Sequence, residues 1–161
     1  MNTIGIIGLG NPLRRDDGIG LVLLDQMQCY TKEFGKNITF IDGGTGGMNL
    51  LHQLSRFGSI LIIDAVDFKG KPGDAKLFSL EQIKSNKTPE LFSTHESDFI
   101  TILALSAQLN ELPENVSLFG VQPFDVSFGT GLSKQIVPLL DDLSKKLKKE
   151  ILKLIKDNLT S

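Results

Sequence analysis

The stretch that decides the fold is IGIIGLGNPLRRDDGIG, residues 4–20. In it an apolar run ends in a Gly-Asn-Pro turn, and two adjacent acids, Asp16 and Asp17, then open an amphipathic segment. This pattern predicts a buried strand, a loop and a helix. Because ligands of open α/β sheets bind beyond the carboxyl ends of the strands, the two carboxylates stand where a site is expected.

The rest of the chain alternates between strand-like and helix-like patterns. Further strands are expected at 38–42, 59–66, 75–80 and 115–122, and helices at 18–30, 46–56, 97–109 and 132–159. The run at 59–66 is continuously apolar and predicts a central strand, whereas 75–80 alternates like an edge strand. Pro138 is expected to kink the last helix or to mark where its regular part begins. This order predicts one domain, residues 1–161, with an α/β fold: a three-layer α/β/α sandwich around a mostly parallel sheet.

The composition excludes several classes of protein. The 161 residues carry 17 basic and 19 acidic side chains, and the resulting charge of −2 argues against a nucleic-acid partner. Cys29 is the one cysteine, so the chain has neither a disulfide nor a cysteine-based metal site. No window approaches the ~18 apolar residues of a membrane span, and the start of the chain lacks a secretory signal. We therefore expect a cytoplasmic protein with no membrane partner.

The opening stretch offers two candidate features, a glycine-rich loop and the acid pair. The loop begins like a dinucleotide-binding fingerprint, but Leu13 stands at the third glycine position and Pro12 removes an amide donor. We interpret its glycines as a tight strand-to-loop turn. Of the two acids one suffices to cap the following helix, so we assign the cap to Asp16 and the chemistry to Asp17.

Two further side chains join Asp17 as candidates for chemistry. Asp64 ends the apolar run at 59–66, where a carboxylate is costly unless it is paired or used. His95 precedes a predicted helix, which suits a metal ligand or an acid/base group, whereas His52 lies within an amphipathic helix and is expected at the surface. Such a set of oxygen and nitrogen donors fits Zn, Ni or Fe with open coordination positions. It also fits acid/base hydrolysis by carboxylates without a metal.

Five segments, in this order, match the pattern of one family. They are GLGN at 8–11 with DDGIG at 16–20, DGGTGG at 42–47, IDA at 63–65, TH at 94–95 and FGVQP at 119–123. Together they resemble the [NiFe]-hydrogenase maturation endopeptidases, which remove a C-terminal peptide from the hydrogenase large subunit. The resemblance covers most of the chain.

The resemblance implies a fold, a site and a partner. The fold is a five-stranded twisted sheet with one antiparallel edge strand, of the phosphorylase/hydrolase-like type. Asp17, Asp64 and His95 look like the family's metal-contacting trio and Asp42 like a further acid in the cleft, so that all four are candidate catalytic residues. No tightly bound cofactor is expected, because the nickel is carried by the substrate as a recognition tag, although zinc or cadmium could occupy the site in crystals. The partner is the precursor of a [NiFe]-hydrogenase large subunit, and the protease is expected to be a monomer.

Two other interpretations stay open at this point. Peptidyl-tRNA hydrolases resemble this chain in the strand and Gly-Leu-Gly-Asn-Pro turn, but they need a catalytic histidine in the region where Arg-Arg-Asp-Asp stands at 14–17. The second alternative is a module that binds the hydrogenase precursor without cutting it. The presence of Asp17, Asp64 and His95 together argues against such an inactive relative.

Overall fold

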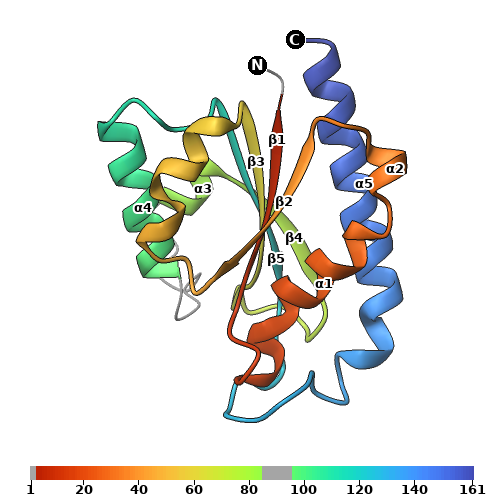
Figure 1. The fold of residues 1–161 in the computed structure, drawn as a ribbon. Helices are drawn as coiled ribbons and strands as arrows, with labels where there is room; N and C mark the ends of the chain where they lie inside the picture. Colours follow the sequence, from red (N-terminus) through yellow and green to blue (C-terminus); the bar gives the residue numbers. More distant parts are fainter. Residues whose placement is uncertain (1–2, 85–95) are drawn as a thin grey trace.

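The computed structural model describes residues 3–84 and 96–161, and in that part of the chain five strands form one sheet between two layers of helices (Figure 1). The strand order is β2-β1-β3-β5-β4. Strands β1 (Ile4–Leu9), β2 (Ile38–Gly44), β3 (Ser59–Ala65) and β5 (Asn115–Val121) are parallel. The edge strand β4 (Ala75–Ser79) runs antiparallel to β5. The prediction of a mostly parallel sheet with one antiparallel edge strand is confirmed.

Helices cover both faces of the sheet. Figure 1 shows α1 (Ile19–Gln28) and α5 (Leu140–Leu159) on one side, and α4 (Glu96–Gln108) with the 3-10 helix η2 (Met48–Arg56) on the other. The shorter helical segments are η1 (Arg15–Gly18), α2 (Thr31–Phe34), α3 (Leu80–Lys84) and η3 (Val137–Leu139). Among the described residues, no helix combines the length and the apolar character that crossing a bilayer requires.

The central strand β3 supplies both apolar cores. Leu61 and Ile63 pack in the cluster that contains the buried faces of α1 and α5. Ile60 and Ile62 pack in the other cluster, with η2 and α4. Because alternate residues of a strand point to opposite faces, a strand covered on both sides is apolar throughout, as the run at 59–66 is.

Two predicted helices differ from those in the structure. The segment predicted as a helix at 46–56 is a 3-10 helix that begins only at Met48, because Gly47 before it is extended. The helix predicted at 132–159 becomes regular at Leu140, after η3. Pro138 lies at the start of η3, where its missing N–H costs no helical hydrogen bond, so it marks the beginning of the regular part rather than a kink. The polar segment 84–92, where Pro89 predicts a loop or a short irregular helix, lies outside the described residues except for Lys84, which ends α3.

Gly20 allows α1 to pass directly over the carboxyl ends of β1 and β3. A Cβ atom at Gly20 would lie 2.2 Å from the carbonyl oxygen of Leu9 and 2.3 Å from that of Ile63. Both oxygens belong to the backbone of central strands, which cannot move aside without disturbing the sheet. Only glycine therefore fits, and the chain just before α1 is held against the end of β3.

We expect Gly20→Ala to lower the free energy of unfolding by about 3 kcal/mol, because the added methyl group overlaps two fixed carbonyl oxygens. Gly47→Ala is the matched control, since nothing lies within 4 Å of the Cβ position there. Urea denaturation of the two variants measures the difference. Equal stability of both would contradict the close approach of α1 to the strand ends.

Candidate active site

The carboxyl ends of the parallel strands meet at the lower edge of the sheet in Figure 1. The acids predicted for the site stand there: Asp42 near the end of β2, Asp64 near the end of β3, and Asp17 in η1, which follows β1. All three acids therefore lie toward this edge of the sheet. Their side chains differ in direction, burial and hydrogen bonding.

Asp64 is a buried carboxylate on the face of the sheet that η2 and α4 cover. Asp64 is 1% exposed. Because alternate residues of a strand point to the same face, its side chain points to the same face of the sheet as those of Ile60 and Ile62. The amide of Ala65 donates a hydrogen bond of 2.8 Å to Asp64 Oδ1. A carboxylate buried this deeply at a strand end loses most of its hydration, and this loss costs free energy. A functional role for the side chain would explain why this cost is tolerated.

Asp17 is equally buried, at 2% exposure, in the short helix η1 that packs against β3. The amide of Asn11 donates a hydrogen bond of 3.1 Å to Asp17 Oδ2. A Cβ atom at Gly10 would lie 2.3 Å from the main-chain oxygen of Asp17, and Gly10 has a φ of 153°. The glycine turn thus folds the chain back on itself and holds Asp17 beside the end of β3, which confirms its interpretation as a tight turn.

Asp42 is exposed and points away from Asp64. It pairs in register with Gly8, and its direction follows that of Phe40, so its side chain leaves the sheet on the α1 face. The amide of Gly44 donates a hydrogen bond of 2.9 Å to Asp42 Oδ1 and closes a turn at the end of β2. Strands β2 and β3 lie on either side of β1, about 10 Å apart. The structure therefore does not bring Asp42 and Asp64 to the same face.

The fourth predicted residue, His95, lies outside the described residues. Helix α4 begins at Glu96, and its Phe99 side chain packs at the same edge of the sheet, because a Cβ atom at Gly46 would lie 3.4 Å from Phe99 Cβ. Within residues 3–84 and 96–161, no three His, Cys, Asp or Glu side chains form a group that could hold a metal ion. The other histidine, His52, is exposed, with Nδ1 3.1 Å from Glu111 Oε2, as expected for a surface histidine.

Asp16 does not cap a helix, contrary to the prediction. Among the residues that the structure describes, no side chain makes a capping hydrogen bond at the start of η1 or α1. Asp16 is fully buried, and its Oδ2 accepts hydrogen bonds from the amides of Phe124 (3.0 Å) and Asp125 (2.9 Å) and from the hydroxyl of Ser133 (2.7 Å). Its Oδ1 accepts a fourth, of 2.7 Å, from the amide of Ser133. Because both acids lie in η1 and α1 starts only after Gly18, the Asp16 carboxylate faces the segment 123–133 instead of the amides of α1.

Gln122, at the end of β5, is a second buried side chain that joins loops at this edge. Its Oε1 accepts hydrogen bonds from the amides of Phe68 (2.9 Å) and Gly70 (3.1 Å), and its Nε2 donates to Asp67 Oδ1 at 3.2 Å. The hydrogen bond from the Lys69 amide, aided by that from Gln122, lowers the pKa of Asp67. Sequence reasoning assigned no such role to Asp16 or Gln122, because their partners lie 108 and 54 residues away along the chain.

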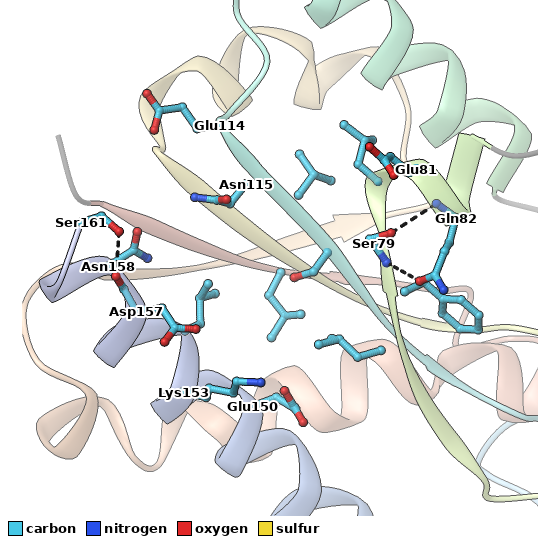
Figure 2. A pocket seen from close by; sticks show the side chains of 17 residues that line it. Ser79, Glu81, Gln82, Glu114, Asn115, Glu150, Lys153, Asp157, Asn158 and Ser161 are labelled. Atoms are coloured by element: carbon cyan, nitrogen blue, oxygen red, sulfur yellow. Dashed lines mark hydrogen bonds between the residues drawn. The ribbon is translucent and has the colours of Figure 1, made fainter.

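A cavity of about 680 Å³ lies at the opposite, amino edge of the sheet (Figure 2). It is bordered by the end of β4, the start of β5 and the last turns of α5, including Ser79, Asn115, Lys153 and Asp157. Neither Asp17, Asp42 nor Asp64 lines it. The three acids thus lie toward the carboxyl edge of the sheet and not in this cavity.

Known proteins resemble this chain over most of its length. A family model described as hydrogenase maturation protease matches residues 23–152. The chain is 31% identical over 132 residues to the hydrogenase expression/formation protein HupD of Thiocapsa roseopersicina. This alignment covers 81% of this chain and 59% of HupD. It is 28% identical over 141 residues to the hydrogenase expression/formation protein HoxM of Cupriavidus necator. That alignment covers 87% of this chain and 69% of HoxM. The chain thus spans about three fifths of the length of the HupD relative.

Solved structures share the fold. The [NiFe] hydrogenase maturation protease HybD from Thermococcus kodakarensis superposes with a TM-score of 0.74 at 28% identity, over 92% of this chain and 99% of that one. The hydrogenase maturating endopeptidase HybD from E. coli superposes with a TM-score of 0.78 over 94% of this chain and 93% of that one. Its sequence identity is 22%, so this likeness supports the fold alone.

Proposed function

This chain belongs to the hydrogenase maturation protease family, and on that premise we propose that it is an endopeptidase acting on a [NiFe]-hydrogenase large-subunit precursor. It removes the C-terminal extension of the precursor after nickel has been inserted. The observation that carries the proposal is the burial of two carboxylates, Asp17 and Asp64, on adjacent elements at the carboxyl edge of the sheet. Family membership sets aside the peptidyl-tRNA hydrolase-like alternative.

The nickel in this proposal is part of the substrate. Carboxylate oxygens and an imidazole nitrogen are suitable nickel ligands, so Asp17, Asp64 and His95 lend three donors to the ion in the precursor. The start of α4 at this edge of the sheet, immediately after His95, supports the participation of the imidazole. When nickel is absent, the three donors have nothing to bind and the scissile peptide is poorly positioned.

Hydrolysis then needs an activated water and a polarised carbonyl group. The nickel ion of the substrate polarises the carbonyl or the water. A carboxylate takes a proton from the attacking water, and a proton passes to the departing amine as the peptide bond breaks. Asp17 is the base in this proposal, because Asp42 leaves the sheet on the opposite face from Asp64.

We propose no resident cofactor for the protein. Zinc or cadmium is expected to occupy the same donors in crystals, because both accept oxygen and nitrogen ligands. The enzyme is proposed to act as a monomer in the cytoplasm.

The proposal is tested by incubating the protein with nickel-loaded precursor and recording the intact mass of the large subunit. We expect a loss of mass equal to a C-terminal segment, with the N-terminus unchanged. A stable complex without any loss of mass would contradict the protease assignment and favour the non-cleaving binding module.

A further inference from the structure

Two adjacent buried acids, Asp16 and Asp17, bind different parts of the fold from the same short helix. The four hydrogen bonds that the Asp16 carboxylate accepts come from the segment 123–133, which follows β5. The Asp17 carboxylate accepts the amide of Asn11, in the turn that follows β1. Successive side chains of a helix point in different directions, so η1 presents the two carboxylates to two segments. Asp16 is therefore joined to the candidate active site through the backbone of η1.

The first residue of η1 has a backbone conformation that its surroundings must hold in place. Arg15 has a φ of 44°, in the left-handed region that residues with a Cβ atom rarely adopt. Its amide donates a hydrogen bond of 3.1 Å to the oxygen of Gly129, and the amide of Asp16 donates one of 3.0 Å to the oxygen of Asp125. The Arg15 guanidinium group lies against Gly129, where a Cβ atom would be 2.7 Å from Arg15 Cζ. An unfavourable conformation persists only where such contacts over-determine it, so the segment 123–133 sets the path of the chain into η1.

The helix η1 lies between the segment 123–133 and the end of β3, against which it packs. Figure 1 shows the chain between β5 and α5 passing below the sheet, beside the turn that precedes α1. The Asp16 carboxylate binds both ends of the segment 123–133, at Phe124 and at Ser133. Asp16 is fully buried, so a movement of η1 would leave these donors without an acceptor, which is costly. The carboxylate therefore fixes η1 relative to the sheet.

We propose that Asp16 is a positioning residue for Asp17. Asp16 does not touch the precursor: its hydrogen bonds fix η1 against the segment 123–133, and η1 holds the Asp17 carboxylate beside the end of β3, where Asp64 stands. The proposal rests on the function proposed above, because that function assigns the nickel contact and the proton transfer to Asp17. A catalytic group displaced by about 1 Å lowers the rate about a hundredfold, so a residue that fixes its position affects the rate without reacting.

The rate of cleavage at a saturating concentration of nickel-loaded precursor tests this proposal. Asp16→Asn replaces the carboxylate by an amide with one acceptor oxygen, whose NH2 group opposes at least one of the four donors. This variant is expected to reduce kcat about thirtyfold, because Asp17 is displaced. Ser133→Ala removes one of the four hydrogen bonds and is expected to reduce kcat about threefold. This milder variant carries the test if Asp16→Asn does not fold.

Ile151→Ala is the matched control for a loss of stability without displacement of η1. Ile151 is fully buried in the second half of α5, and its truncation destabilises the fold by leaving a cavity in the core. At a temperature where all variants are folded, Ile151→Ala is expected to keep kcat within about twofold of the wild-type value. Equal losses of kcat in Ile151→Ala and Asp16→Asn would overturn the positioning role and leave the protease assignment standing. A wild-type kcat in Asp16→Asn would do the same.

The backbone amide proton of Asn11 gives a readout by NMR that does not depend on cleavage. This amide donates to Asp17 Oδ2 at 3.1 Å, so its chemical shift reports where the carboxylate lies. The resonance is expected to move upfield in Asp16→Asn and to stay in place in Ile151→Ala. Such a movement, with no cleavage of precursor by the wild-type protein, would support the positioning role and contradict the protease assignment. An unchanged resonance in the folded Asp16 or Ser133 variant would overturn the positioning role.

Discussion

Asp64→Asn and Asp17→Asn are each expected to reduce the rate of precursor cleavage about a thousandfold, with the fold intact. Asparagine preserves the size of the side chain and one acceptor oxygen, so the amide of Ala65 keeps a partner at position 64 and the amide of Asn11 keeps one at position 17. What disappears is the negative charge that, in the proposed function, binds the substrate nickel and, at Asp17, accepts a proton.

The measurement is the initial rate at which nickel-loaded precursor loses its C-terminal segment. His95→Ala belongs to the same series and is expected to show a loss of similar size. Asp25→Asn, at an exposed position of α1, is the control for the removal of a carboxylate and is expected to cleave normally. Thermal melting monitors the fold. If the three site variants all process the precursor at the wild-type rate, the assignment of the site is wrong.

Asp16→Ala is expected to lower the free energy of unfolding by about 3 kcal/mol. The substitution leaves three amides and one hydroxyl without their acceptor, and two of these donors belong to the buried Ser133. Ser133→Ala removes the hydroxyl alone and is expected to cost about 1 kcal/mol. Urea denaturation compares the two variants.

The Asp16 variant also tests whether the segment 123–133 is positioned by this carboxylate. With this segment released, its peptide bonds after Phe124 and Phe128 are expected to be cut faster by chymotrypsin than in the wild-type protein. Asp16→Ala with wild-type stability and a wild-type rate of chymotrypsin cleavage would show that the four hydrogen bonds hold nothing in place.

The sheet could be predicted from the sequence because its signals are local. The unbroken apolar run of β3 and the alternation of β4 each follow from what covers the strand. The extent of the last helix was less predictable, since residues 132–139 have helical spacing but fold as a turn and as η3, with Pro138 at the start of η3. Local sequence patterns thus predict that a helix or strand exists better than they predict the residues at which it begins and ends.

The roles of individual acids were only partly predictable. Asp64 could be found because a carboxylate at the end of a buried strand is unusual and costly. The function of Asp16 could not, because an acid before a helix looks like a cap whatever its distant partners are, and those partners are Phe124, Asp125 and Ser133. The direction of Asp42 depends on the pairing of β2 with β1, which the sequence pattern does not specify.

The nickel dependence of cleavage tests the central claim most directly. Wild-type protein is incubated with equal amounts of nickel-loaded and nickel-free precursor, and the intact mass of each large subunit is followed over time. The account predicts loss of the C-terminal segment from the nickel-loaded precursor alone, because Asp17, Asp64 and His95 act through the nickel of the substrate. Cleavage of both precursors at equal rates would contradict it.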